Sequence, residues 1–207
     1  METWLLITRF GDSAILIPMA ALIVVWLGLA RNWAGLFTWC ALFGSAMMLV
    51  IVTKLLFMGW GIGIEEIDFT GFSGHASRAA AVLPVLFSLL FGKAPRSWRS
   101  GPVLIGWSLA LLLTVSRVVV NAHSQSEAWF GFALGAAVST TFLSLQRESR
   151  FGLARIWLLV PCMALLIAPP ATKPGKAHEW ITGVALYLSG REAPFSREQL
   201  HVGHHAG

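Results

Sequence analysis

Six apolar runs constrain the fold of this chain more than any other feature of its sequence. They cover residues 13–30, 36–53, 76–91, 102–120, 128–145 and 153–168. A helix needs about 20 apolar residues to cross the roughly 30 Å hydrocarbon core of a bilayer. Several runs are shorter than this, so we expect their ends to extend into flanking residues. The sequence therefore predicts an all-α, polytopic membrane protein with about six transmembrane helices.

Composition supports a bilayer location. Hydrophobic residues make up 56% of the chain and charged residues only 12%, whereas about a quarter of the residues in soluble domains are charged. The formal net charge is +5, but the Lys and Arg residues are spread over short connections between apolar runs. This distribution indicates membrane topology and argues against nucleic acid as a partner.

We expect two parts along the chain. Residues 1–170 form the six-helix transmembrane domain, and the opening METWLLITRFGDS belongs to its first helix because it lacks the basic flank and cleavage site of a signal peptide. Residues 171–207 form a polar tail, because the prolines from Pro169 onward cannot continue a helix. Within the tail, residues 178–188 could form a short interfacial helix.

The distribution of cations predicts the topology. With six crossings, one side of the membrane carries a set of cations opposed only by Glu148, and short loops rich in Lys and Arg stay in the cytoplasm. We therefore expect a bacterial inner membrane protein whose other polar clusters face the periplasm. The cytoplasmic set is Arg31, Lys93, Arg96, Arg99, Arg147, Arg150 and Arg155.

The first polar cluster is Gly71-Phe72-Ser73-Gly74-His75, where the third long apolar run begins. Ser73 can cap a helix there, and the free N–H groups of that helix end, with the positive end of its dipole, form a site for an anion such as phosphate. His75 would stand beside the anion. The alternative is an ordinary N-cap with an interfacial histidine.

The second cluster is Ser116-Arg117 followed by His123 and Glu127. A guanidinium within an apolar stretch is costly unless it meets an anion or reaches the membrane edge. His123 and Glu127 are four residues apart, so on a helical turn they share one face and the carboxylate can accept the imidazole N–H. That contact fixes the tautomer and leaves the other ring nitrogen free as a nucleophile.

Together these residues resemble the type 2 phosphatidic acid phosphatase superfamily, which comprises membrane lipid phosphatases with a haloperoxidase-related helical core. The family pattern is a Lys, six residues and Arg-Pro; Pro-Ser-Gly-His; and Ser-Arg, five residues, His, three residues and Asp. Lys54 matches the first motif, Phe72-Ser73-Gly74-His75 the second, and Ser116-Arg117 with His123 and Glu127 the third.

Three positions depart from this pattern. Gly61-Ile62 replaces Arg-Pro, Phe72 replaces a proline, and Glu127 replaces an aspartate. The first departure removes a phosphate-binding guanidinium. Arg78, one turn after His75, could supply the missing cation; the alternative is a lone arginine near the interface.

The resemblance implies the roles of these residues. His123 attacks phosphorus and forms a phosphohistidine, Glu127 orients it, and His75 protonates the leaving oxygen. Phosphate is bound by Lys54, Ser73, Gly74, Arg117 and, on the hypothesis above, Arg78. We expect no metal or other cofactor, and we interpret Glu65, Glu66 and Asp68 as a solvated loop or as headgroup contacts.

The implied activity is hydrolysis of a lipid phosphate or diphosphate monoester, with membrane lipids as surroundings. Undecaprenyl diphosphate, phosphatidylglycerol phosphate, phosphatidate and lipid A fit equally well, and the oligomeric state is not indicated. The alternatives are a lipid phosphotransferase, a degenerate protein that binds lipid phosphate without cleaving it, an anion transporter and a structural assembly protein.

Overall fold

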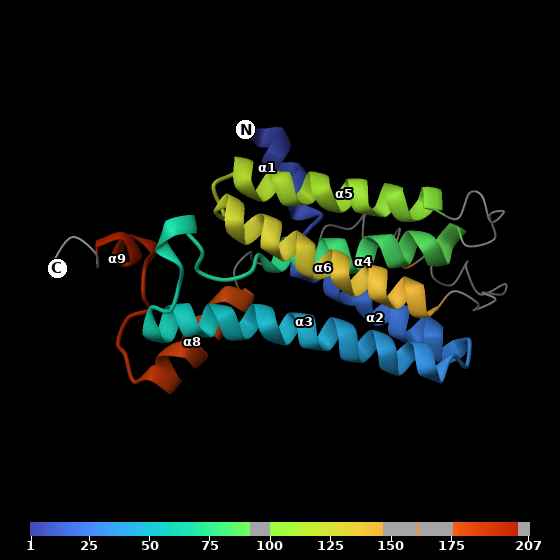
Figure 1. Cartoon of the computed structure of the whole chain (residues 1–207), viewed down its shortest axis with the longest axis horizontal. Coiled ribbons are helices and arrows are strands. Elements are labelled where there is room, and N and C mark those ends of the chain that lie inside the picture. The colour runs from blue at the N-terminus through green and yellow to red at the C-terminus, as the bar shows by residue number, and fades with distance from the viewer. Residues whose placement is uncertain (92–99, 147–160, 162–175, 203–207) are drawn as a thin grey trace.

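The computed structural model is all-α and describes residues 1–91, 100–146, 161 and 176–202 (Figure 1). Its first part contains α1 (Glu2–Arg9), α2 (Ser13–Leu29), α3 (Trp33–Trp60) and the short 3-10 helix η1 (Glu65–Ile67). The second part contains α4 (Gly74–Phe91), α5 (Ser100–Val119), α6 (Gln125–Leu145), α8 (Lys176–Ser189) and α9 (Arg197–Val202).

Five stretches of the described chain are long and apolar enough to cross a membrane. They correspond to the first five predicted spans and run over Glu2–Leu29, Trp33–Trp60, Gly74–Phe91, Ser100–Val119 and Gln125–Leu145. The predicted all-α membrane architecture is confirmed. The sixth predicted span, residues 153–168, lies outside the described residues apart from Pro161, as does the predicted boundary at residue 170. Helix α8 covers the predicted interfacial segment, whose place at the interface stays a prediction.

Local capping sets the ends of the membrane helices. Asp12 caps α2 by accepting the N–H of Ala14 at 2.9 Å, and Asn32 caps α3 by accepting the N–H of Gly35 at 2.9 Å. Helix α3 runs on to Trp60, beyond the predicted end at residue 53, and stops at Gly61 in the left-handed conformation (φ 71°). Lys54 therefore lies inside α3 and not in the loop that follows it.

Helix α4 lies at the centre of the bundle, between α2, α5 and α6 (Figure 1). Ala79, Ala80 and Ala81 have no exposed surface. Glycines on the neighbouring helices let the backbones approach: a Cβ at Gly106 of α5 would lie 2.6 Å from the Cα of Pro84, and one at Gly135 of α6 would lie 2.9 Å from the Cβ of Ala80. Such small-residue contacts are the usual way in which membrane helices pack closely.

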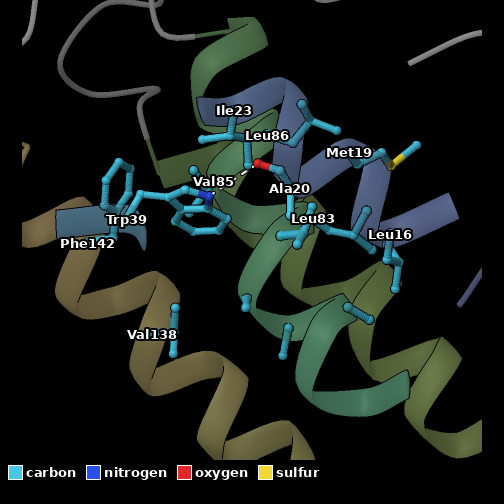
Figure 2. Packing of buried hydrophobic residues seen from close by; sticks show 14 of the residues in the cluster. Leu16, Met19, Ala20, Ile23, Trp39, Leu83, Val85, Leu86, Val138 and Phe142 are labelled. Atoms are coloured by element: carbon cyan, nitrogen blue, oxygen red, sulfur yellow. Dashed lines mark hydrogen bonds between the residues drawn. The ribbon is translucent and has the colours of Figure 1, made fainter. Parts of the chain in front are cut away.

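The apolar core ties α2 and α3 to α4 and α6. Trp39 of α3 is 1% exposed, donates its indole N–H to the carbonyl of Ala20 at 3.2 Å, and meets Phe142 of α6 edge to face at 5.3 Å between ring centroids (Figure 2). An edge-to-face pair and a satisfied indole stabilise this contact beyond the burial of apolar area. The core thereby fixes α6 relative to the first two spans.

The outer faces of the bundle are apolar. Large side chains of α3 and α5 stay exposed although they are hydrophobic, and a surface of this kind is stable in lipid but not in water. The chain is therefore a multi-pass membrane protein. The exposed residues include Phe37, Met48, Leu49, Ile51 and Val52 on α3, and Leu104, Ile105, Leu109, Leu111 and Leu112 on α5.

All elements that carry the sequence motifs meet at one end of the bundle. Figure 1 shows the C-terminal ends of α3 and α5, the N-terminal ends of α4 and α6, and the η1 loop together at this end, with the connection between α2 and α3 at the opposite end. The up-and-down order of the helices produces this arrangement, because alternate connections fall on the same side.

Candidate active site

His123 and Glu127 form a hydrogen-bonded pair at the start of α6. His123 Nδ1 lies 2.8 Å from Glu127 Oε2. The pair does not share a helical face as the spacing suggested, because His123 precedes the helix. Ser124 is the N-cap, its hydroxyl accepts the N–H of Glu127, and the Glu127 carboxylate accepts the N–H of Ser124, which makes a capping box. The cap turns the carboxylate back toward His123.

Glu127 is the most heavily hydrogen-bonded carboxylate in the described part of the chain, and it is 1% exposed. Oε2 receives His123 Nδ1 and, at 3.3 Å, the N–H of Ser124. Oε1 receives the N–H of Thr70 at 3.0 Å, the Thr70 hydroxyl, and Arg197 Nη2 at 2.8 Å. A carboxylate with this many donors stays ionised, so the His123 proton sits on Nδ1 and Nε2 carries a lone pair.

The Ser73-Gly74-His75 motif starts α4 as the sequence predicted. The Ser73 hydroxyl lies 3.5 Å from the N–H of Ala76, and the Ser73 carbonyl accepts the N–H of Ser77 at 3.0 Å. The Ser73 N–H donates to the backbone carbonyl of Glu127 at 3.0 Å. This bond fixes the N-terminus of α4 beside the N-terminus of α6, so both motifs share one site.

His75 lies next to Asp12. Its Nε2 is 4.0 Å from Asp12 Oδ2, and its side chain is 21% exposed. A Cβ at Gly11 would lie 3.3 Å from the imidazole Cδ2, so the backbone of Gly11 packs closely against the ring. The N-terminal segment therefore forms one wall of the site.

Three cations surround the two histidines. Arg78 folds back toward the start of α4, with Nη1 3.0 Å from where a Gly74 Cβ would stand, and the Lys54 stem lies against Gly71. Arg117 donates to the Thr8 hydroxyl at 3.1 Å. Lys54 interacts electrostatically with both arginines. The buried Nε atoms of Arg78 and Arg117 have no hydrogen-bond acceptor among the described residues, so both guanidiniums retain capacity for an anion.

Burial, together with the charges of Lys54 and Arg117, favours the neutral form of His123. Burial lowers the pKa of this imidazole most strongly, and Lys54 and Arg117 lower it further. The hydrogen bond and charge of Glu127 raise it, but the net pKa lies below the ordinary 6.5. A neutral imidazole near pH 7 is the form that can act as a nucleophile.

The structure also adds residues that the sequence patterns did not indicate. Thr8, Asp12, Thr70 and Arg197 all reach the site. Asp68, which we interpreted as part of a solvated acidic loop, pairs with Arg197. Only Asp12 had a local signal, as a helix N-cap. The other contacts join segments far apart in the sequence and leave no periodicity that would reveal them.

Gly61, which stands where the family pattern has an arginine, has a structural role in this chain. Gly61 has a positive φ, and a Cβ there would lie 3.0 Å from the ring of Phe195 on the C-terminal tail. A larger residue would be strained at this φ and would crowd the ring. Gly61 thus ends α3 and provides the surface against which the C-terminal tail packs.

The family model for the "PAP2 superfamily" matches residues 65–151, a stretch that contains the Ser73-Gly74-His75, Ser116-Arg117, His123 and Glu127 positions. The chain belongs to the PAP2 superfamily. This confirms the resemblance recognised in the sequence.

Two relatives extend the similarity. The chain is 37% identical over 203 residues to the "Uncharacterized 22.5 kDa protein in cps region" of Klebsiella pneumoniae, covering 96% of this chain and 97% of that protein. It is 29% identical over 136 residues to "Phosphatidylglycerophosphatase B" of Bacillus subtilis (strain 168), covering 62% of this chain and 66% of that protein. No solved structure matches the chain significantly.

Proposed function

We propose that this protein is a membrane phosphatase that hydrolyses a lipid phosphate or diphosphate monoester through a phosphohistidine, at the periplasmic face of a bacterial inner membrane. The observation that carries the proposal is the 2.8 Å contact of His123 Nδ1 with the buried Glu127 carboxylate, within reach of the charges of Lys54 and Arg117. Membership of the PAP2 superfamily and the similarity to a phosphatidylglycerophosphatase support a phosphatase.

The reaction has two steps. In the first, the Nε2 lone pair of His123 attacks phosphorus, the bond to the lipid oxygen breaks, and His75 gives its proton to that oxygen. In the second, His75 takes a proton from water, the water oxygen attacks the phosphohistidine, and inorganic phosphate leaves while His123 recovers its lone pair. General acid–base steps of this kind contribute about 10² to 10⁴ in rate. Glu127 holds the imidazole and balances the positive charge that it gains.

Electrostatics supply the rest of the catalysis, because phosphoryl transfer concentrates charge on the equatorial oxygens. In the proposed complex, Lys54, Arg78 and Arg117 bind those oxygens together with the Ser73 hydroxyl and the Gly74 N–H. The Nε atoms of both arginines, which have no acceptor in the described part of the chain, support this assignment. No metal or other cofactor is required in this scheme.

The place of the site supports a lipid phosphate as the substrate class. It lies at the end of a bundle whose outer faces are apolar, so a headgroup can enter while its lipid tails remain in the bilayer. The name of the Bacillus subtilis relative makes phosphatidylglycerol phosphate the first substrate to test. Undecaprenyl diphosphate, phosphatidate and lipid A complete the panel.

The deciding experiment measures release of inorganic phosphate by purified protein from this panel in detergent micelles. Wild type should release phosphate from at least one lipid, and His123→Ala should release none. A ³²P-labelled substrate quenched in alkali should leave label on wild type and none on the variant. Binding of lipid phosphate without release of phosphate would instead identify a degenerate family member, and transfer of label to a second lipid would identify a phosphotransferase.

A separate experiment tests the proposed topology. In a variant without native cysteines, Glu66→Cys on the η1 loop should react with a membrane-impermeant maleimide from outside spheroplasts. Arg31→Cys, in the connection between α2 and α3, should react only after the membrane is opened. Both positions are exposed in the structure. Labelling of Arg31→Cys in intact spheroplasts contradicts the periplasmic site.

A further inference from the structure

We propose that Arg197 of the C-terminal tail is a positioning residue for the reaction at His123, acting through Glu127. This inference rests on the proposed function. Arg197 lies on α9, 70 residues after Glu127, and its Nη2 donates to Glu127 Oε1 at 2.8 Å while Nη1 pairs with Asp68. The guanidinium thus bridges the η1 loop and the carboxylate that holds the nucleophile.

The tail is held against the rest of the protein by several independent contacts. The Phe195 N–H donates to the carbonyl of Met58 at 2.9 Å, and the Phe195 ring packs over Gly61 at the end of α3. Leu200 packs in a small apolar cluster with Phe57 and Met58. These contacts place Arg197 before it forms any ion pair, so its two charge-assisted hydrogen bonds cost little additional conformational entropy.

Arg197 and His123 bind different oxygens of the Glu127 carboxylate. Glu127 has one more rotatable bond than the aspartate of the family pattern, so its carboxylate needs an additional constraint to hold one orientation. Arg197 and Thr70 bind Oε1, while His123 and Ser124 bind Oε2. With both oxygens bound, the carboxylate plane is fixed and the imidazole is directed into the site. Arg197 therefore compensates for the extra flexibility of the longer side chain at position 127.

The same contact affects the proton affinity of His123. The Arg197 guanidinium already offsets part of the negative charge of Glu127. The carboxylate therefore stabilises a protonated His123 less than it would without Arg197. Carboxylate neighbours in turn raise the pKa of Arg197 despite the burial that lowers it, so the guanidinium remains charged. Within the described ranges, the other charged or titratable groups that act on His123 or Glu127 are His75, Lys54 and Arg117, with Asp68 bound to Arg197 itself.

A double-mutant cycle tests the positioning role. Arg197→Gln should lower kcat/KM by about tenfold or more, because loss of the correct orientation of His123 weakens binding of the transition state. In a Glu127→Asp background the shorter carboxylate retracts from the tail, so adding Arg197→Gln should change kcat/KM by less than threefold. Arg191→Gln is the matched control, since it removes the same charge from the same tail at an exposed residue that stacks on Phe195. An equal loss in both backgrounds overturns the inference.

A second measurement is independent of turnover. In protein labelled with ¹⁵N-histidine, NMR titration should give a higher pKa for His123 in Arg197→Gln than in wild type, and an unchanged one in Arg197→Lys and Arg191→Gln. If wild type releases no phosphate, the proposed function fails while this titration still decides the role of Arg197. A lower Tm for Arg197→Gln with an unchanged His123 titration identifies a merely structural role and overturns the inference.

Discussion

Replacing Glu127 with glutamine tests the proposed site most directly, because the substitution keeps the shape of the side chain and changes one group from an acceptor to a donor. Every partner of this carboxylate among the described residues is a donor: His123 and the Ser124 N–H on Oε2, and Thr70 and Arg197 on Oε1. A glutamine NH₂ must therefore face a donor in either orientation. No flip of the amide satisfies the site.

The number of donors on each side decides which orientation the amide takes. Three donors, one of them a guanidinium, converge on Oε1, whereas two converge on Oε2. The amide oxygen should take the Oε1 position, because abandoning a charged donor costs more than abandoning a neutral one. The NH₂ then faces His123 and moves the imidazole proton to Nε2, where it blocks attack. A triad held in the wrong tautomer loses about 10⁴ in kcat, and we expect a loss of about 10³ to 10⁴.

The assay is phosphate release in detergent micelles, with kcat and KM measured separately. Glu127→Gln should lower kcat with little change in KM, because the phosphate-binding cations are untouched. It should retain a trace of activity, while His123→Ala should retain none. Glu66→Gln is the control, since it makes the same change at an exposed carboxylate on the η1 loop, and it should match wild type.

Two results would refute this reasoning. A Glu127→Gln variant with kcat within tenfold of wild type would mean that the tautomer of His123 does not limit the reaction. A variant that loses binding but not turnover would mean that Glu127 acts on the substrate site and not on the nucleophile. Equal Tm values for wild type and variant establish that the comparison concerns catalysis.

Four further predictions follow from the same geometry. Arg78→Lys should lose much of the activity and Arg78→Ala nearly all, because a guanidinium binds phosphate through two N–H groups and an ammonium through one; normal turnover in both would leave Arg78 as an interfacial residue. Gly135→Ala should lower the Tm in detergent by the equivalent of about 1 to 3 kcal/mol, because a Cβ there would overlap the carbonyl of Ser77. Gly44→Ala is the control and should leave the Tm unchanged, because a Cβ at Gly44 meets nothing within 4 Å. Equal Tm values for the two variants would contradict the tight contact of α4 with α6. Burial, and to a smaller extent Lys54 and Arg117, hold the pKa of His123 below 6.5. The nucleophile therefore stays neutral as the pH falls through 6.5, and the acid limb of the kcat/KM profile should lie below that pH. An acid limb above pH 6.5 would argue against a neutral His123. EDTA should leave turnover unchanged, and a loss restored by Mg²⁺ would place the protein in another class of phosphatase.

The sequence by itself determined the membrane class, the approximate positions of five described spans and the membership of a family. Each of these is encoded locally. A run of apolar residues defines a span wherever it occurs, and Ser73-Gly74-His75 defines a helix start from neighbouring residues alone. The prediction erred where local signals overlap: the apolar residues after Thr53 continued α3 until Gly61 ended it, which moved Lys54 into the helix.

The tertiary structure decided how the site is assembled. The bond from the Ser73 N–H to the Glu127 carbonyl, and the glycine contacts of α4 with α6, bring together motifs that the sequence only places on the same end of the bundle. The pairing of His123 with Glu127 was predicted from their spacing, but the capping box that produces it became visible only in the folded loop.

Arg197 marks the limit of sequence reasoning most clearly. Nothing near Arg197 in the sequence distinguishes it from the other tail arginine, Arg191. Its position depends on the close approach of Phe195 to Gly61 and of Leu200 to Gly63, contacts between segments more than 130 residues apart along the chain. Such contacts arise from shape and packing, which have no sequence period, so only the folded chain places this charge on Glu127.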